Sequence, residues 1–564
     1  MSHTLEQCLT LHQEKAWHAA ELAYQNLLKK EPENHQLNHL MGVLYLQINK
    51  TEQAITFFKK AIKLHKEEPS YFNNLANAYQ KSNQLQEAEK AYQTALTIEA
   101  TNLISLNNLA NLYQKKKRYS ESLNLYIKAA HLEPGNLDTH YALGLLFIKL
   151  SREIEAITQF KNVLTLDECH LNAHFYLGTL YLNSNQLKKA KPHFQSVLTL
   201  DSEHCDALVN LGTLHLKQGR AQLAIDTFAK ALAYNNDSIE AQNNLAATFM
   251  THERYQNAVP HYEDLLKKDS NNTEYLYNLG VACMNTSAAT DAKKLFKKLI
   301  KIVPTHASAH INLAAIYSRE ENKTQTAIYL KKAIEIDSND HASTFMLHAL
   351  ENKPLQNAST HYVKQLFNSY APHYEQHLKK ELDYQLPTKF KDTLRLIFPS
   401  ARQTANILDL GVGTGLLGQT LKQYAKYLAG IDLSEKMLAL AKEKNFYDEL
   451  LEQEIISYLK ETPHAFDLII AGDVLPYFGE LDTLFNLLPR ALSPTGHCIL
   501  SIEKAKITPF KLQTTGRFCH HPDYLEKLAK KANLTLIESK DISLRNDKNS
   551  TIEGCLMTFQ KSNN

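Results

Sequence analysis

The sequence predicts two different folds in one chain: a long solenoid of paired helices, followed by an α/β domain with an open and mostly parallel sheet. Three observations lead to this prediction. Small residues recur every 34 positions through the first 340 residues. Ten of the 17 glycines fall in residues 361–564, where short β-rich runs alternate with helical ones. One of these β-rich runs leads directly into a glycine-rich loop at 411–415.

The 34-residue period holds without an insertion. A small residue recurs in what we expect to be the first helix of each pair, at Gly42, Ala76, Ala110, Gly144, Gly178, Gly212, Ala246, Gly280 and Ala314. An aromatic residue recurs in the second helix, at Tyr24, Phe58, Tyr92, Tyr126, Phe160, Phe194, Phe228, Tyr262 and Phe296. Small residues let paired helices approach closely, and the aromatic side chains fill the space between neighbouring units.

These columns resemble the tetratricopeptide repeat, with ten units in register over residues 1–340. The resemblance implies an all-α superhelical solenoid. Residues 341–352 continue the helical pattern and are expected to form a capping helix. Residues 353–360 are polar and include a proline, so we place the capping helix and linker at 341–360 and the next domain at 361–564.

An asparagine column is the one feature of the repeats that packing does not predict. The asparagine amide both donates and accepts hydrogen bonds, so it can pair with the backbone of an extended peptide. The column resembles the one that lines the groove of O-linked N-acetylglucosamine transferases, which implies a protein or peptide partner. The alternative is a solvated helix face, and the column is interrupted at Ala142 and Tyr176. Its members are Asn74, Asn108, Asn210, Asn244, Asn278 and Asn312.

Residues 361–564 are expected to form the α/β domain. Helices are predicted over 361–396, and later helices alternate with strands. The last two predicted strands form a hairpin at the edge of a Rossmann-like sheet. The predicted strands are 405–410, 427–432, 466–472, 497–503, 534–542 and 552–561.

The segment at 405–418, A-N-I-L-D-L-G-V-G-T-G-L-L-G, carries the chemistry of the predicted α/β domain. Its glycines let the backbone turn tightly and let a ligand lie against it. Gly413, Gly415 and Gly418 fit the G-x-G-x-x-G spacing of a dinucleotide site, and Asp432 follows about 20 residues on. Asp409, before the first glycine, favours S-adenosylmethionine, because a carboxylate there can meet the ammonium group of that cofactor.

The D-x-G-x-G-x-G pattern resembles the glycine motif of class I S-adenosylmethionine-dependent methyltransferases. The resemblance implies that Asp409, Gly411, Gly413 and Gly415 form the cofactor loop. It also implies that Asp432, at the end of the second predicted strand, holds both ribose hydroxyls.

Two further acidic residues are assigned to the cofactor site. Glu454 falls where the family usually places an aspartate near the adenine amine, and it departs from that pattern by one methylene. Asp473 lies at the carboxyl end of the 466–472 strand, the edge at which open α/β sheets bind ligands.

Three more segments narrow the resemblance: residues 366–387, P-Y-F-G-E-L at 476–481, and T-G-R-F-C-H at 515–520. They look like the bacterial predicted methyltransferases that carry tetratricopeptide repeats. This resemblance implies an S-adenosylmethionine-dependent methyltransferase whose helical arm recruits a substrate or a partner protein. The alternatives are a non-enzymatic scaffold with a degenerate methyltransferase domain and a nicotinamide-dependent oxidoreductase. The intact acidic and glycine positions of the loop argue against degeneration.

The sequence shows no pairing of a nucleophile with a base. A sulfonium is an activated methyl donor, so alignment and exclusion of water suffice unless the acceptor must lose a proton. Candidates near the pocket are Tyr477, Arg517 and His520. Arg517 could pair with a carboxylate or phosphate of the substrate, Tyr477 fits a half-buried wall, and His520 fits a surface position equally well. The catalytic residues and the methyl acceptor are left open.

Composition excludes several other classes of protein. The chain has 564 residues, 44% of them hydrophobic, with a net charge of +2. No run approaches the roughly 18 apolar residues of a membrane span. Residues 1–360 carry 37 basic and 36 acidic side chains, and residues 361–564 carry 25 and 24. Because neither part has a basic excess, a nucleic-acid partner is disfavoured.

The seven cysteines are far apart and contain no C-x-x-C pair. This pattern argues against a disulfide framework and against a zinc site, so no metal is expected. The first residues lack the basic and apolar regions of a signal peptide. We therefore expect a cytoplasmic protein.

Overall fold

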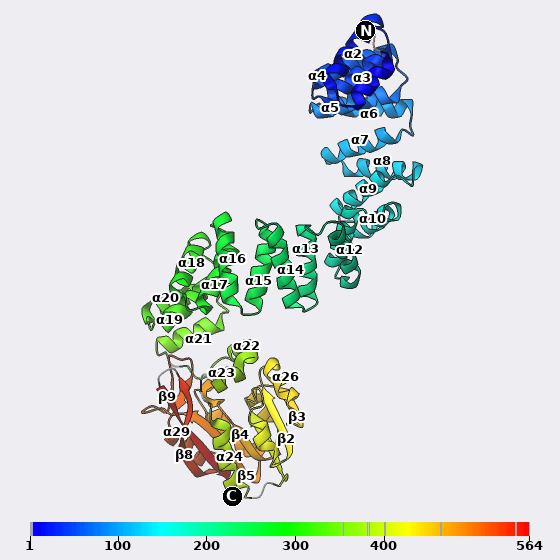
Figure 1. Cartoon of the computed structure of the whole chain (residues 1–564). Coiled ribbons are helices and arrows are strands. Elements are labelled where there is room, and N and C mark those ends of the chain that lie inside the picture. Colours follow the sequence, from blue (N-terminus) through cyan, green and yellow to red (C-terminus); the bar gives the residue numbers. More distant parts are fainter. Residues whose placement is uncertain are drawn as a thin grey trace. The chain divides into compact units, whose positions relative to one another are not determined.

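The computed structural model describes residues 4–562, except for 354, 381, 383, 400–401, 463–464 and 548–549. The chain forms two compact units, Met1–Leu265 and Leu266–Asn564 (Figure 1). The described residues of the first unit are helical repeats, and the second unit holds the remaining repeats together with the α/β domain. The boundary that we placed at 341–360 concerns the change from repeats to α/β fold, and it stays a prediction.

The first unit consists of helices that pair as the 34-residue period predicts. They are α1 (Leu5–Gln13), α2 (Trp17–Lys30), α3 (His35–Gln47), α4 (Thr51–Leu64), α5 (Pro69–Lys81), α6 (Leu85–Ile98), α7 (Leu103–Lys115), α8 (Tyr119–Leu132), α9 (Leu137–Lys149), α10 (Glu153–Leu166), α11 (Leu171–Asn183), α12 (Leu187–Leu200), α13 (Cys205–Lys217), α14 (Ala221–Tyr234), α15 (Ile239–Thr251) and α16 (Tyr255–Lys268), whose last residues belong to the second unit. The second unit continues with α17 (Thr273–Asn285), α18 (Ala289–Ile302), α19 (Ala307–Arg319), α20 (Lys323–Ile336) and α21 (His341–Leu350).

Each repeat begins and turns at equivalent positions. The first helix is capped by the side chain before it, which accepts a hydrogen bond from a main-chain N–H of the first turn. These caps include Asn34, Asn102, Asn136, His170, His204, Ser238, Asn272 and His306. The turn inside each pair holds one residue at positive φ: Lys15, Asn49, Asn83, Lys117, Ser151, Asn185, Gly219, Glu253, Ser287 and Glu321. The same cap and turn therefore repeat along the arm, although their residue types vary.

Within a pair, the small residue of the first helix matches the aromatic residue 16 positions later. Glycine faces phenylalanine in five repeats, and alanine faces tyrosine in three. A Cβ atom at Gly212 would lie 2.5 Å from the Phe228 ring, and the other four glycines are equally close to their rings. The ring therefore packs directly on the glycine backbone in these repeats, and a side chain there would force it aside.

The α/β domain is built on a seven-stranded sheet with the order β3-β2-β1-β4-β5-β9-β8. Its first five strands are parallel, and β9 runs antiparallel to β5 and β8. The strands are β1 (Ala405–Leu410), β2 (Ala425–Asp432), β3 (Glu449–Glu452), β4 (Phe466–Ala471), β5 (Leu492–Glu503), β8 (Leu534–Asp547) and β9 (Ser550–Lys561); β6 (Phe510–Leu512) and β7 (Phe518–His520) form a separate hairpin. All six predicted strands are present. The sequence prediction missed β3, β6 and β7 because runs of three or four residues show no clear alternation.

Helices cover both faces of this sheet. They are α22 (Thr360–Tyr370), η1 (Ala371–His373), α23 (Tyr374–Lys380), α24 (Leu386–Ile397), α25 (Gly418–Lys422), α26 (Glu435–Glu443), α27 (Ile455–Glu461), η2 (Leu475–Tyr477), α28 (Asp482–Ala491) and α29 (Pro522–Lys531). One core joins the sheet to α27, α28 and α29 through residues such as Leu459, Phe485 and Leu525. The other joins it to α24 and α25 through residues such as Phe390 and Leu421. The predicted mixed fold, a repeat solenoid followed by a Rossmann-like domain, is confirmed.

The last repeat helix packs against the α/β domain. Phe345 of α21 lies 4.8 Å from the ring of Tyr362 on α22 and 6.3 Å from that of Phe518 on β7. Ala349 and Leu512 complete this buried cluster. Helix α21 therefore supports both the β6–β7 hairpin and the start of α22.

We expect Phe345→Ala to loosen the β6–β7 hairpin. The ring is 5% exposed, and truncation of a buried phenylalanine costs about 3–5 kcal/mol. Hydrogen–deuterium exchange of residues 510–520 in the full chain should therefore become faster. Phe228→Ala, which removes a buried ring from the first unit, should leave exchange in the hairpin unchanged. If Phe345→Ala left it unchanged as well, α21 would not support this part of the domain.

Candidate functional site

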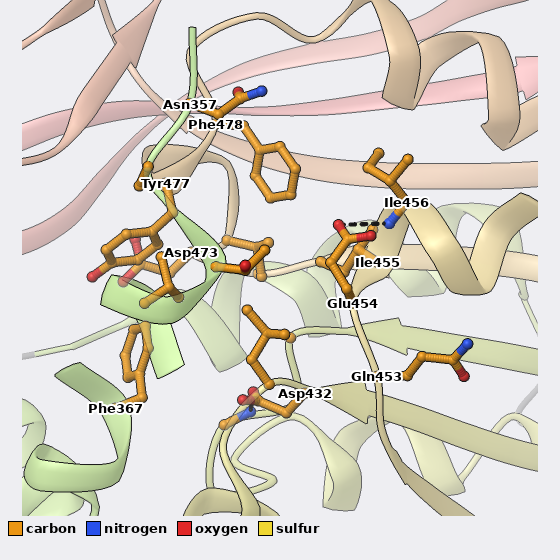
Figure 2. A pocket seen from close by; sticks show the side chains of 18 of the residues that line it. Asn357, Phe367, Asp432, Gln453, Glu454, Ile455, Ile456, Asp473, Tyr477 and Phe478 are labelled. Atoms are coloured by element: carbon orange, nitrogen blue, oxygen red, sulfur yellow. Dashed lines mark hydrogen bonds between the residues drawn. The ribbon is translucent and has the colours of Figure 1, made fainter. Parts of the chain in front are cut away.

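The α/β domain has a cavity of about 190 Å³ at the carboxyl ends of its parallel strands. The loops that follow β1, β2, β3 and β4 line it, together with the segment 357–374. Figure 2 shows Glu454 and Ile456 on one side of the view, with Phe367 and Tyr477 on the other. The cavity thus occupies the edge of the sheet at which parallel α/β folds bind ligands.

The glycine loop forms part of the cavity wall, and its glycines have different structural roles. Gly411 has a φ of +72°, and a Cβ there would lie 2.3 Å from the Val474 side chain. Gly413 has a φ of +55°, and a Cβ there would meet only Tyr374, at 3.8 Å. Gly411 therefore permits a close approach between two loops, whereas Gly413 leaves open space for a ligand.

Asp432 ends β2 and lines the same cavity. Its Oδ2 accepts a hydrogen bond from the Gly413 N–H at 2.8 Å, and its Oδ1 accepts one from the Ser434 N–H at 2.8 Å. Burial raises the pKa of Asp432, and these N–H donors oppose that effect. Each oxygen keeps a further lone pair, so the carboxylate can also accept hydrogen bonds from a ligand.

Asp409 and Gly415 pack against protein atoms. Asp409 is 1% exposed, and its Oδ2 accepts a hydrogen bond from the Tyr447 hydroxyl at 2.6 Å. Burial raises the pKa of Asp409 to about 7, although the hydrogen bond from Tyr447 opposes it. A Cβ at Gly415 would lie 3.2 Å from both Ala441 and Tyr447. The structure thus brings all four predicted loop residues together, with Gly411 and Gly413 at the cavity wall.

Glu454 lines the cavity and also caps a helix. One carboxylate oxygen accepts a hydrogen bond from the Ile456 N–H at 2.9 Å (Figure 2), and the other accepts one from the Ser457 N–H at 2.7 Å. These bonds satisfy the first turn of α27. Sequence reasoning gave Glu454 only an adenine contact, and the structural role as a cap was missed.

Asp473 belongs to a buried group of four charges. It follows β4 with a φ of +60°, a conformation that is costly for a residue other than glycine. Arg517 on the β6–β7 turn pairs with Asp473 and, through Nε, with Glu503 at 2.5 Å. Arg545 of β8 contacts Glu503 at 2.7 Å and Asp473 at 3.7 Å. The negative charges of two acidic side chains and the positive charges of two basic ones therefore balance beside the cavity.

The three catalytic candidates lie close together, but their surroundings differ. The Tyr477 hydroxyl accepts a hydrogen bond from Arg517 Nη1 at 3.0 Å, and Tyr477 lines the cavity. All three guanidinium nitrogens of Arg517 donate within the protein, to Glu503, Tyr477 and Asp473. This engagement leaves Arg517 poorly placed to pair with a substrate anion.

His520 is fully buried, which excludes the surface position that we considered for it. Its Nε2 lies 3.1 Å from the Gly479 carbonyl oxygen. Burial lowers the pKa of His520 to about 4, so the ring is neutral near pH 7.

The segment 357–374 contributes site residues that sequence reasoning missed. Asn357, Thr360, Val363, Phe367 and Tyr374 all line the cavity. Residues 366–387 entered the sequence analysis only through a family resemblance. Their position beside the glycine loop depends on contacts between segments far apart in sequence, which local patterns do not reveal.

The predicted asparagine column contributes to contacts between repeats. Asn74 contacts His39 at 2.8 Å, Asn108 donates to Asn73 at 3.0 Å, and Asn210 donates to Thr179 at 3.2 Å. In each case the two side chains belong to successive repeats. Packing therefore accounts for part of a column that we had attributed to a peptide, and a peptide contact at all six positions stays a prediction.

Family models match both parts of the chain. A model described as a methyltransferase domain matches residues 408–500. Models of the tetratricopeptide repeat match 42–83, 69–102, 103–132, 184–248, 243–307 and 307–340.

Curated relatives match part of the chain at low identity. An uncharacterized methyltransferase of Schizosaccharomyces pombe is 24% identical over 211 residues, which are 33% of this chain and 71% of that protein. A ubiquinone biosynthesis O-methyltransferase of Xylella fastidiosa is 26% identical over 139 residues, 23% of this chain and 56% of that protein. For the malonyl-[acyl-carrier protein] O-methyltransferase of Enterobacter lignolyticus the identity is 28% over 134 residues, with 24% and 50% covered. The chain thus spans only part of the length of each relative.

Solved structures match the repeats. The structure of YrrB, a TPR protein with an unusual peptide-binding site, is 27% identical, covers 33% of this chain and 96% of its own, and has a TM-score of 0.31. A TPR repeat-containing protein of Cytophaga hutchinsonii is 15% identical, covers 43% of this chain and 99% of its own, and has a TM-score of 0.38.

None of the described helices has the length and the apolar run that a bilayer crossing requires. Within the part of the chain that the structure describes, no group of three or more His, Cys, Asp or Glu side chains is arranged to hold a metal ion. All seven cysteines are free thiols.

We expect Asp409→Asn to stabilise the α/β domain at pH 8 but not at pH 5. The folded pKa of about 7 lies above the unfolded value, so the native state binds the extra proton between about pH 4 and 7 and loses stability as the pH rises through that window. Asparagine stands in for the protonated acid and can still accept the Tyr447 hydrogen bond.

The measurement is the melting temperature of each variant at pH 5 and pH 8. Asp448→Asn is the control with the opposite sign. Burial alone would raise the pKa of Asp448, but Lys422 and the Leu428 N–H hold it below its usual value. That variant should therefore lose stability at both pH values. If the difference in melting temperature between Asp409→Asn and the wild type were the same at pH 5 and pH 8, it would contradict the raised pKa.

Proposed function

We propose that this chain, which joins tetratricopeptide repeats to a methyltransferase domain, is an S-adenosylmethionine-dependent methyltransferase whose repeat arm recruits a protein or peptide. The observation that carries the proposal is the cavity between the glycine loop and Asp432. It combines an open glycine surface at Gly413 with a carboxylate that the backbone already holds in place. It also lies at the carboxyl ends of β1 and β2.

The charge of the lining supports this cofactor. Asp432, Glu454 and Asp473 line the cavity, and no Lys, Arg or His does so among the described residues. S-adenosylmethionine carries a sulfonium and an ammonium group, which favourably meet such a lining. A nicotinamide dinucleotide would bring a pyrophosphate into the same place, where no cation offsets its charge.

The roles that we assign follow from these positions. Asp432 would accept hydrogen bonds from the ribose hydroxyls, and Gly411 and Gly413 would lie against the cofactor. Glu454 is assigned to the adenine side, with its carboxylate oriented by α27. Because Asp409 is buried, it would support the glycine loop from behind.

The cofactor supplies an activated methyl group, so the chain has to align an acceptor and exclude water. Phe367 and Tyr477 line the part of the cavity away from Glu454 (Figure 2), and the Tyr374 ring lies 6.2 Å from that of Phe367; these three residues would form the acceptor side. Burial raises the pKa of Tyr374 and Tyr477, so both phenols keep their protons near neutral pH. Asp473, which the sequence led us to assign to the cofactor, shares Arg517 with Tyr477, so we reassign it to the acceptor side, where Arg517 would act as its positioning residue.

We place this activity in the cytoplasm. The support is the presence of seven free cysteines, two of which, Cys169 and Cys205, are exposed or half-buried. Thiols in such positions are typical of a reducing compartment.

The cofactor assignment is tested by calorimetric titration of the full chain with S-adenosylhomocysteine. We expect micromolar binding, and Asp432→Asn should weaken it about 100-fold because two charge-assisted hydrogen bonds are lost. Asp541→Asn changes an exposed carboxylate on β8 and should bind as the wild type does. Binding of a nicotinamide dinucleotide in place of S-adenosylhomocysteine would support an oxidoreductase. A folded chain that binds neither would support the scaffold alternative.

A further inference from the structure

The first unit contains a polar cavity of about 460 Å³, to which the asparagine column contributes only Asn108. It spans three successive repeats, through α5, α7 and α9. Its lining consists of Asn77, Gln80, Tyr92, Asn108, Asn111, Gln114, Lys115 and Lys149. Every one of these side chains carries a polar atom, and none is a carboxylate.

Two tyrosine hydroxyls orient the amides of this cavity. Tyr126 donates to the Asn111 side-chain oxygen at 2.6 Å, while Gln114 donates to the Tyr126 hydroxyl at 3.3 Å. Burial raises the pKa of Tyr126 to about 12, so the phenol keeps the proton that it donates. One repeat earlier, Tyr92 donates in the same way to the Asn77 oxygen.

This arrangement leaves amide N–H groups for a ligand. The side-chain oxygens of Asn77 and Asn111 each already accept a hydrogen bond from a tyrosine hydroxyl. The Nδ2 groups are therefore the part of each amide that can still bond a ligand. Among the described side chains, neither Nδ2 has an acceptor. An amide nitrogen can only donate, so a ligand here must supply hydrogen-bond acceptors.

Two lysines add positive charge at the same place. Lys115 and Lys149 occupy equivalent positions in successive repeats, and both are exposed. Lys149 lies over the Tyr119 ring at 5.0 Å, and no salt bridge joins either lysine to a described carboxylate. The neighbouring Lys116 and Arg118, by contrast, are already paired with Glu89.

We propose that this cavity binds an acidic peptide in an extended conformation. Carbonyl oxygens of the peptide would accept hydrogen bonds from Asn77 and Asn111, and its carboxylates would pair with Lys115 and Lys149. This inference rests on one part of the proposed function, the recruitment of a peptide by the repeat arm. It does not depend on methyl transfer.

A peptide fits these groups better than a nucleic acid does. The two oriented amides recur from one repeat to the next, which suits the repeating carbonyls of an extended main chain. The positive charge is confined to two lysines, and residues 1–360 as a whole carry 37 basic and 36 acidic side chains. A nucleic acid needs a wider basic surface.

The experiment measures fluorescence anisotropy of a labelled peptide of alternating glutamate and alanine on titration with the full chain. A peptide with glutamine in place of glutamate is the uncharged probe. We expect the acidic peptide to bind about tenfold more tightly, with an affinity that falls as salt is added.

Variants locate the binding site. The double change Lys115→Gln and Lys149→Gln should remove most of the preference for glutamate. Asn111→Leu should weaken both probes, because a backbone contact is lost. Lys217→Gln, at the equivalent position two repeats beyond Lys149 and outside the cavity lining, should bind both probes as the wild type does. Lys115, Lys149 and Lys217 are exposed, so the lysine changes should leave folding unaffected.

Three outcomes would overturn the proposal. Equal binding of the two probes would remove the charge preference. If Lys217→Gln lost as much affinity for the acidic peptide as the double variant does, the attraction between peptide and lysines would be non-specific. Tighter binding of a single-stranded oligonucleotide than of the acidic peptide would assign the cavity to phosphates. Binding of S-adenosylhomocysteine, measured on the same samples, separates any of these results from a failure of the proposed enzyme function.

Discussion

Close approach between backbone and side chain is the constraint on which both folds of this chain depend. In the repeats, the Phe228 ring fills the place where a Cβ of Gly212 would lie, and the same contact recurs in four other helix pairs. In the α/β domain, Val474 fills the equivalent space at Gly411, and Val412 fills it at Gly430. Tight packing leaves no room to relax these contacts. They join the two helices of a repeat in one fold, and in the other they hold the glycine loop against the segment that follows β4.

The size of the small residue has a second consequence in the arm. Where it is glycine, the facing ring is phenylalanine and the interior of the pair is apolar. In three repeats it is alanine and the ring is tyrosine, and in two of these the tyrosine hydroxyl donates to an amide on the first helix, at Asn77 and Asn111. A repeat that combines alanine with an asparagine at the next position thus presents an oriented polar group. The polar cavity of the first unit lies where two such repeats are adjacent.

The α/β cavity is preorganised by groups outside it. Backbone N–H groups hold both oxygens of Asp432, the first turn of α27 holds Glu454, and Arg517 holds Asp473. A carboxylate that is already oriented loses little freedom when a ligand arrives, which favours binding. The support reaches beyond the domain: α21, the last repeat helix, packs on the hairpin that carries Arg517. The β6–β7 hairpin therefore carries both the hydrogen bonds of Arg517 to the cavity residues Tyr477 and Asp473 and the packing contact with the last repeat helix.

The sequence by itself determined the periodic and local features of this protein. The 34-residue columns predicted the repeats, and alternating runs predicted six strands of the sheet. The glycine loop and Asp432 predicted part of the cavity wall, because these features depend on neighbours in sequence. Only the tertiary structure decided which atoms are already engaged. It showed that Arg517 is paired with Asp473 and Glu503, that His520 is buried, and that Glu454 caps a helix. It also brought residues 357–374 to the cavity. Except for the Glu454 cap, which is local, these contacts join segments more than ten residues apart, and no local pattern of residue types records them.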